Sequence, residues 1–228
     1  MAWDFAAEIH ALSGFDADLV GTTGSTSGEN LSLHTNQWLT QGAKEIINVL
    51  PSKLKSKCMT ETTLNNSSTT MDLDGVGEVL YVTRLSADSG GYRISCRKVP
   101  AEHGELSGDS SNMMYYATAT DPVYWLTSSS DATILNVNPT PTVNQTAIVF
   151  HVAYPTVAFD GTAIANFPDE AEYLVVLYAA IKATQYMMLS EEDPEVYSPQ
   201  LQTLQQDYAK GISILKGGGT PQAAKGQE

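Results

Sequence analysis

The sequence predicts an α+β protein in which helices from both ends of the chain form one core and an antiparallel β-sheet or sandwich is inserted between them. Two observations carry this prediction. Apolar residues recur three and four positions apart near both ends of the chain, as they do on one face of a helix. Between them, short runs rich in β-branched and aromatic residues are separated by turn residues, as in antiparallel strands. The expected parts are an N-terminal helical part (1–60), an inserted β-domain (61–155), a C-terminal helical hairpin packing on the N-terminal helices (156–215) and a flexible tail (216–228).

The N-terminal part is expected to contain two helices. In DFAAEIHALSG (4–14), three apolar residues share one helical face and Gly14 is the stop signal. These apolar residues are Phe5, Ile9 and Leu12. A glycine- and serine-rich loop, GTTGSTSGEN (21–30), follows. The second helix runs through NQWLTQGAKEIINVL (36–50) and ends at Pro51. Its apolar side consists of Trp38, Leu39, Ala43, Ile46, Ile47 and Leu50.

The middle of the chain has the pattern of short antiparallel strands. SADSGG (86–91) and SSSD (128–131) have the composition of hairpin loops, and DLDGVG (72–77) supplies a turn before the first strand. We therefore predict strands at 77–85, 92–99, 113–120, 122–128, 132–138 and 147–154.

A long apolar helix is predicted after the strands. NFPDEAEYLVVLYAAIKATQYMMLSEED (166–193) has only one charged residue, Lys182, in its apolar middle. We expect Asn166 or Phe167 to cap this helix and Pro168 to lie in its first turn. The acidic residues that follow complement the positive end of the helix dipole.

This helix is hydrophobic on two nearly opposite sides. One face consists of Leu174, Leu177, Ile181 and Met188, and we expect it to pack on the chain's own helices. The other face consists of Val176, Ala179, Ala183 and Tyr186, and its small residues would let another backbone approach closely. We expect a second copy of the protein to cover this second face, so its four residues are candidates for a subunit interface or for helix packing.

A last helix is expected after the acidic segment SEEDPEVY (190–197), with Ser198 as its cap and Pro199 in its first turn. In the simplest arrangement its apolar seam packs antiparallel against the long apolar helix. The seam consists of Leu201, Leu204, Tyr208 and Leu215, which are further helix-packing or interface candidates, with Ile212 adjacent.

The charge of the chain argues against a tight hold on nucleic acid and against a membrane span. The formal net charge is −14, from 12 basic and 26 acidic residues, so the chain repels phosphates unless its positive charge is focused. The only tight basic run, Lys53, Lys55 and Lys57, is interpreted as a solvated helix end. A span through 173–190 would place Lys182 near the bilayer centre, at a cost of about 2.5–3.5 kcal/mol. We expect no membrane contact.

No motif for catalysis, cofactor binding or metal binding stands out, and we predict that the protein is not an enzyme. The four histidines are scattered, and the two cysteines match no metal-site spacing. DLDGVGE (72–78) lacks the ligand spacing of a calcium loop. The acidic cluster at 191–195 is interpreted as a solvated loop between helices. We assign no catalytic, cofactor-binding or metal-binding residue.

Four stretches together resemble a known family. They are ALSGFDAD (11–18), NQWLTQGAKEIINVLP (36–51), DPVYWLTSSSDATILNVNPTP (121–141), and VAYPTV (152–157) with FPDEAEYLVVLYAA (167–180). In this order, and with the helix–β–helix layout, they resemble the head-to-tail adaptor, or connector, proteins of tailed bacteriophages, of the tail-tubular-protein-A type. The resemblance covers most of residues 9–215.

The resemblance implies a structural protein of the virion, located in the neck or tail of a bacteriophage and made in the host cytoplasm. Its copies would form a twelvefold ring that docks under the portal protein and leads to a downstream tail or nozzle protein. Genomic DNA would pass without sequence-specific binding, because a lumen lined by carboxylates repels phosphates. The tail would contact the portal, with Lys216, Gly217 and Pro221 as candidate contact residues.

Two other classes of function stay open at this point. One is a different virion part: a tail terminator, a baseplate component or a capsid decoration protein. The other is a β-rich ligand-binding module, or an enzyme whose site is assembled only by the fold. Binding to an isolated portal distinguishes the adaptor from the other virion parts, and a pocket with several convergent polar side chains favours the binding module.

Overall fold

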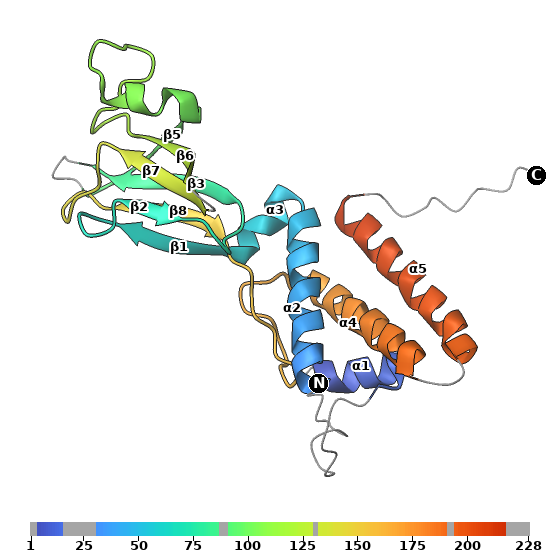
Figure 1. Cartoon of the computed structure of the whole chain (residues 1–228). Helices are drawn as coiled ribbons and strands as arrows, with labels where there is room; N and C mark the ends of the chain where they lie inside the picture. The colour runs from blue at the N-terminus through green and yellow to red at the C-terminus, as the bar shows by residue number, and fades with distance from the viewer. Residues whose placement is uncertain (1–3, 16–30, 87–90, 130–131, 191–193, 218–228) are drawn as a thin grey trace, which may run out of the picture. The chain divides into compact units, whose positions relative to one another are not determined.

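The structure, a computed structural model, describes residues 4–15, 31–86, 91–129, 132–190 and 194–217. The chain forms two compact units, each of which is described by itself (Figure 1). The predicted α+β fold class is confirmed, because helices from both ends of the chain share one unit and the strands belong to the other. The helical unit comprises Met1–Cys58 and Tyr154–Glu228, and the β unit comprises Met59–Ala153.

The first helix, α1 (Phe5–Ser13), begins and ends where its sequence predicts. The carboxylate of Asp4 accepts hydrogen bonds from two backbone N–H groups of the first turn, at 3.1 and 3.5 Å, and so caps the helix. Gly14 adopts a left-handed conformation, with φ 74°, and its N–H donates to a carbonyl of the last turn. Phe5 and Ile9 are buried, as their spacing predicts.

The second helix, α2 (Leu31–Val49), begins five residues before its predicted start at residue 36 and ends ahead of Pro51. The sequence pattern misses the first turns because an apolar residue, Leu33, is exposed there and a polar one, Thr35, is buried. A prediction that places apolar residues on the buried face therefore fails at these positions. The predicted apolar side is buried at Leu39, Ala43, Ile46, Ile47 and Leu50, and Trp38 is half-buried. Two short elements follow: α3 (Ser52–Lys55) and the 3-10 turn η1 (Ser56–Cys58).

The long apolar helix is α4 (Asp169–Ser190). The residue directly before the helix is Pro168, whereas the predicted caps were Asn166 or Phe167. The predicted start was therefore too early. The first turn is instead tied to the preceding loop, because the Glu172 carboxylate accepts a hydrogen bond of 2.7 Å from the N–H of Ile164.

The last helix, α5 (Ser198–Leu215), follows the 3-10 turn η4 (Pro194–Tyr197) directly. Ser198 is therefore the first residue of the helix rather than its cap, and no side chain caps it. The predicted loops at 21–30 and 191–193 lie outside the described residues.

The β unit consists of two four-stranded sheets. The first is antiparallel, in the order β1 (Met59–Leu64), β8 (Ala147–Val152), β3 (Val79–Leu85), β4 (Arg93–Ser95). The second has the order β2 (Thr70–Asp72), β7 (Ala132–Asn138), β6 (Val123–Ser129), β5 (Arg97–Lys98). In this second sheet the β5–β6 pair is parallel, so the sheet is mixed rather than wholly antiparallel as predicted. Between β5 and β6 lie the 3-10 turns η2 (Ala101–His103) and η3 (Glu105–Gly108).

Four predicted strands are confirmed within two residues of their predicted ends: 77–85, 122–128, 132–138 and 147–154. The run at 92–99 is divided between the two sheets, because the chain crosses from one to the other at the buried Cys96. The sequence pattern misses β1, in which polar residues predominate, and β2, which is only three residues long.

The strand predicted at 113–120 is wrong, because this segment forms turns. The side-chain oxygen of Asn112 accepts hydrogen bonds from the N–H groups of Met114 and Tyr115, both at 3.2 Å. These local bonds offer the backbone an alternative to a β-ladder.

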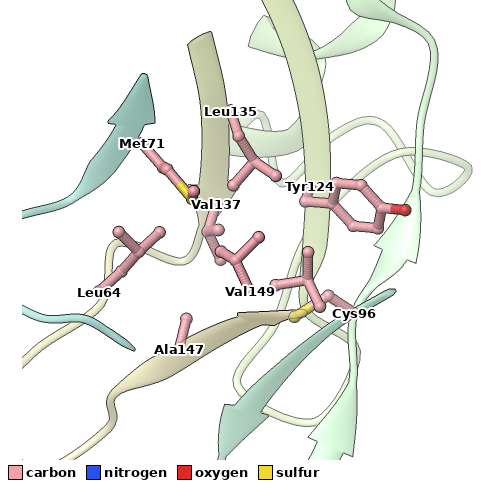
Figure 2. Close-up of a cluster of buried hydrophobic side chains, with 9 residues drawn as sticks. Leu64, Met71, Cys96, Tyr124, Leu135, Val137, Ala147 and Val149 are labelled. Carbon is pink, nitrogen blue, oxygen red and sulfur yellow. The ribbon is translucent and has the colours of Figure 1, made fainter. Parts of the chain in front are cut away.

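The two sheets share one hydrophobic core (Figure 2). Side chains from strands of both sheets point toward one another, and most are fully buried. Each fully buried aliphatic side chain contributes about 1.5–3 kcal/mol to the free energy of unfolding. The core consists of Leu64, Met71, Val82, Cys96, Tyr124, Leu135, Val137, Ala147 and Val149.

Candidate functional site

The centre of the helical unit is α4, which packs against α1, α2 and α5 (Figure 1). On α4, side chains are buried on nearly every side from Ala171 to Thr184, rather than along one stripe. This explains why the helix carries so little charge, because three helices of the same chain surround it.

Two glycines allow the neighbouring helices to approach α4 closely. A Cβ atom at Gly42 of α2 would lie 2.9 Å from Cδ1 of Tyr178. A Cβ atom at Gly211 of α5 would lie 2.3 Å from Cδ2 of Leu174. The close approaches to α4 at Tyr178 and Leu174 therefore occur within one chain, and glycines of the neighbouring helices make them possible.

The expectation that a second copy covers the Val176, Ala179 and Ala183 face of α4 is wrong for these three residues. Each is 0% exposed in a single chain. The physical reason is that α4 has helices of its own chain on both of its apolar sides, so no part of these side chains is left for a neighbouring molecule. Of the two roles considered for them, helix packing fits the structure.

Tyr186, the fourth residue of that face, is half-buried in an aromatic cluster. Its ring centroid lies 6.1 Å from that of Phe15, 6.0 Å from that of Trp38 and 6.3 Å from that of His34. This cluster joins the end of α1, the first half of α2 and the second half of α4.

The apolar seam of α5 faces α4. Leu204 is buried, and Leu201, Tyr208 and Leu215 are half-buried. Gly211 lies against Leu174 and Tyr208 against Tyr178, so residue numbers rise on one helix as they fall on the other. The two helices therefore run antiparallel.

A polar network on the surface of the helical unit connects α2, α4 and α5. The hydroxyl of Tyr178 donates a hydrogen bond of 3.0 Å to the carboxylate of Glu45, and the Tyr178 ring lies 6.0 Å from that of Tyr208. Burial and the hydrogen bond to Glu45 raise the pKa of Tyr178 to about 12, and burial raises the pKa of Tyr208.

The raised pKa of Tyr178 predicts that the helical unit loses stability at alkaline pH. The folded state disfavours the tyrosinate, so the contribution is complete below the ordinary pKa of 10.0 and disappears as pH approaches the folded pKa of about 12. We expect the urea midpoint, followed by circular dichroism at 222 nm, to fall more between pH 9 and 11 in the wild type than in Tyr178→Phe. Tyr173→Phe, at an exposed position of α4, is the matched control and is expected to keep the wild-type slope. Equal slopes for all three proteins would contradict the prediction.

In the basic run of Lys53, Lys55 and Lys57, the last lysine is paired with a carboxylate. Nζ of Lys57 donates to both carboxylate oxygens of Glu170, at 2.8 and 3.0 Å. This hydrogen-bonded pair raises the pKa of Lys57 and lowers that of Glu170. The pair joins η1 to the first turn of α4, and both side chains are about half exposed.

The described residues contain no group of three or more His, Cys, Asp or Glu side chains that could hold a metal ion. An open hollow in the β unit has both apolar and polar lining. It is lined by Leu73, Val76, Gly77, Val79 and Leu126 together with Glu78, Lys98 and Thr133. Among the described residues, no helix is long and apolar enough to cross a bilayer.

Arg84 and Cys96 are buried titratable groups of the β unit. Nη2 of Arg84 donates to the carbonyl of Thr140 at 3.2 Å and to Oε1 of Gln145 at 3.0 Å, which fastens the loop between β7 and β8 to β3. Burial lowers the pKa of Arg84 and raises that of the Cys96 thiol to about 12. A thiol with so high a pKa is a poor nucleophile at neutral pH.

The predicted tail contacts lie at the end of the described chain. Lys216 and Gly217 follow α5 and are exposed, with Gly217 in a left-handed conformation at φ 78°. Pro221 lies outside the described residues.

The sequence reasoning missed a group of exposed apolar side chains at Met113, Met114 and Tyr116, because it assigned them to a strand. The signal that could have revealed them is the turn-forming run GDSSN (108–112) immediately before them.

Comparison with known proteins places this chain in a family. No match was found among curated proteins. The family model described as SU10 adaptor protein matches residues 17–226, which is most of the chain.

Proposed function

This chain belongs to the SU10 adaptor protein family, and from that membership we propose that it forms the head-to-tail adaptor ring that docks under the portal and continues the DNA channel into the tail. The family is one of structural phage adaptors, which is not an enzyme class. The proposal adds the location in the particle, the ring and its partners, and it keeps twelve copies as the expected number.

The observation that carries the proposal is the family match over both units of the chain. A connector has to hold neighbouring proteins and leave the genome free to move, which requires surfaces rather than a reaction centre. Tyr178 and Arg84, whose pKa values are shifted, each donate hydrogen bonds that join separate elements.

The charge distribution supports a role beside passing DNA. Residues 99–228 contain 4 basic and 15 acidic residues, which gives −11 of the total −14. Free cations would form salt-dependent bonds with phosphates, whereas carboxylates repel them. Nζ of Lys57, in the basic run, lies 2.8 Å from Oε1 of Glu170 and is paired with it. This pairing further reduces the positive charge that could bind phosphates.

Ring contacts are expected at exposed side chains, since Val176, Ala179 and Ala183 of α4 are covered within the chain. Rings use heterologous interfaces, in which one face of a subunit meets a different face of the next. Among the described residues of the helical unit, large exposed apolar side chains lie on α2, α4, η4 and α5. They are Leu33, Tyr173, Leu189, Val196 and Ile214.

The test is assembly with a purified portal. Mixed with portal rings at micromolar concentration, the full-length protein is expected to form a complex of higher mass, with a second ring visible by electron microscopy below the portal. If the two proteins stay separate under these conditions, the proposed function is wrong.

A shortened chain tests the role proposed for the tail. Deleting residues 218–228 leaves α5 and its last turn in place, so the helix signal and thermal transition are expected to stay at the wild-type level. Affinity for the portal is expected to fall at least tenfold. Wild-type affinity would show that residues 218–228, which include the candidate Pro221, do not contact the portal, while leaving the adaptor function in place.

A further inference from the structure

The β unit presents a compact apolar tip between β5 and β6. Met113 is 98% exposed, Met114 is 70% exposed and Tyr116 is 37% exposed. We refer to these three residues as the methionine tip. In Figure 1 the segment that carries them, in green, extends beyond the strands of the β unit. Large apolar side chains gathered at one exposed place mark contact sites more often than scattered ones do.

The backbone of the methionine tip is held in a fixed conformation. The side-chain oxygen of Asn112 accepts from the N–H groups of Met114 and Tyr115, and its carbonyl accepts from the N–H of Tyr116 at 2.9 Å. Nη1 of Arg97 donates to the carbonyl of Met114 at 3.3 Å. Docking of the tip therefore requires little ordering of the backbone, which lowers the entropic cost of binding.

The base of the tip has a small hydrophobic core of its own, and Tyr115 packs against it. The ring of Tyr115 stacks on His103, with centroids 4.3 Å apart, and packs against a buried cluster of Val99, Ala117 and Val123. Gly104 lies so close to the indole of Trp125 that a Cβ atom would be 2.4 Å from Nε1. The segment thus packs one aromatic residue, the half-buried Tyr115, onto the β unit while leaving both methionines exposed.

The segment that carries the tip is acidic in sequence. The segment from Pro100 to Asp121 contains four carboxylates and no Lys or Arg. Asp121 is paired with Arg97 at 3.0 Å. The other three, Glu102, Glu105 and Asp109, are exposed on the segment that leads into the tip, and we refer to them as the acidic rim.

We propose that the methionine tip inserts into an apolar pocket, rimmed by Lys or Arg side chains, on a different protein of the virion. Methionine is unbranched and polarisable, so it fits pockets of irregular shape, and it is enriched at the centre of interfaces. The acidic rim selects a basic partner surface and disfavours a second copy of this chain, which carries a net charge of −14. The inference rests on the proposed function for its setting in the assembled neck, and it adds the chemistry of one contact.

Photo-crosslinking in assembled particles tests the contact. With benzoylphenylalanine at position 113, we expect a crosslink to a virion protein other than this chain, in a peptide that combines apolar residues with Lys or Arg. The same group at Val143, which is 66% exposed in another loop of the β unit, is the matched control and is expected not to capture that peptide. Crosslinks only to a second copy of this chain, or none at all, would overturn the proposal.

Substitution separates this inference from the proposed function. Met113→Asp with Met114→Asp is expected to keep the wild-type thermal transition, because both side chains are exposed, and to lower particle infectivity at least tenfold. Met113→Leu with Met114→Leu, which keeps the tip apolar, is expected to stay within threefold of wild type. Wild-type infectivity of the aspartate variant would show that the tip makes no required contact. Failure of the wild-type protein to assemble on portals would instead count against the proposed function.

Discussion

Replacing Ala179 by glutamate is expected to unfold the helical unit rather than only to block its contact with another molecule. Ala179 is 0% exposed on α4, and helices of the same chain cover both apolar sides of α4. A carboxylate placed there has no space and no partner, and burying an unpaired charge costs several kcal/mol. That cost is a large part of the about 5–15 kcal/mol by which a typical domain is stable.

The measurement is circular dichroism at 222 nm during urea unfolding. Ala179→Glu is expected to lose most of its helix signal without denaturant. Leu189→Glu, on the same helix but at a position that is 88% exposed, is expected to keep the wild-type signal and midpoint. If Ala179→Glu kept the wild-type helix content but failed to assemble, that face of α4 would be an interface after all.

Truncation of Leu135 to alanine is expected to destabilise the β unit by about 2–5 kcal/mol, the usual cost of removing a large aliphatic side chain from a packed core. Leu135 is 0% exposed, lies on the central strand β7 and contacts side chains of both sheets in the shared core (Figure 2). The cavity left behind cannot be filled easily, because strands on both sides of β7 are hydrogen-bonded to it.

Hydrogen exchange gives the required local readout. In Leu135→Ala, the amides of residues 132–138 are expected to exchange at least tenfold faster, while those in the middle of α4 stay close to wild type. Thr133→Ala, at an exposed position of the same strand, serves as the control and is expected to change exchange less than threefold. Uniform acceleration in both units would mean that the chain unfolds as one cooperative body.

The candidate surfaces could be predicted from the sequence only in part. Hydrophobic spacing correctly marks Val176, Ala179 and Ala183 as residues that must be covered, but spacing carries no information on which molecule covers them. The answer depends on where α1, α2 and α5 lie, and on the close approach that Gly42 and Gly211 permit. Those contacts join residues more than a hundred positions apart on the α2 side.

The methionine tip could not be predicted for a related reason. By composition, any of the side chains at positions 113–116 could be the buried one. Tyr115 is the one that stacks on His103 and packs against the cluster of Val99, Ala117 and Val123. The turn chemistry of Asn112 is local and visible in the sequence, but it predicts where the chain bends and not which side chain ends up in solvent.

The sequence alone determined the features that depend on neighbouring residues: the α+β class, the stop of α1 at Gly14 and the end of α2 ahead of Pro51. The tertiary structure decided what covers α4, where the chain crosses between sheets at Cys96, and which apolar side chains stay exposed. The physical reason is the range of the forces involved. Capping and periodicity act over a few residues of chain, whereas burial is a sum over contacts that distant segments bring together.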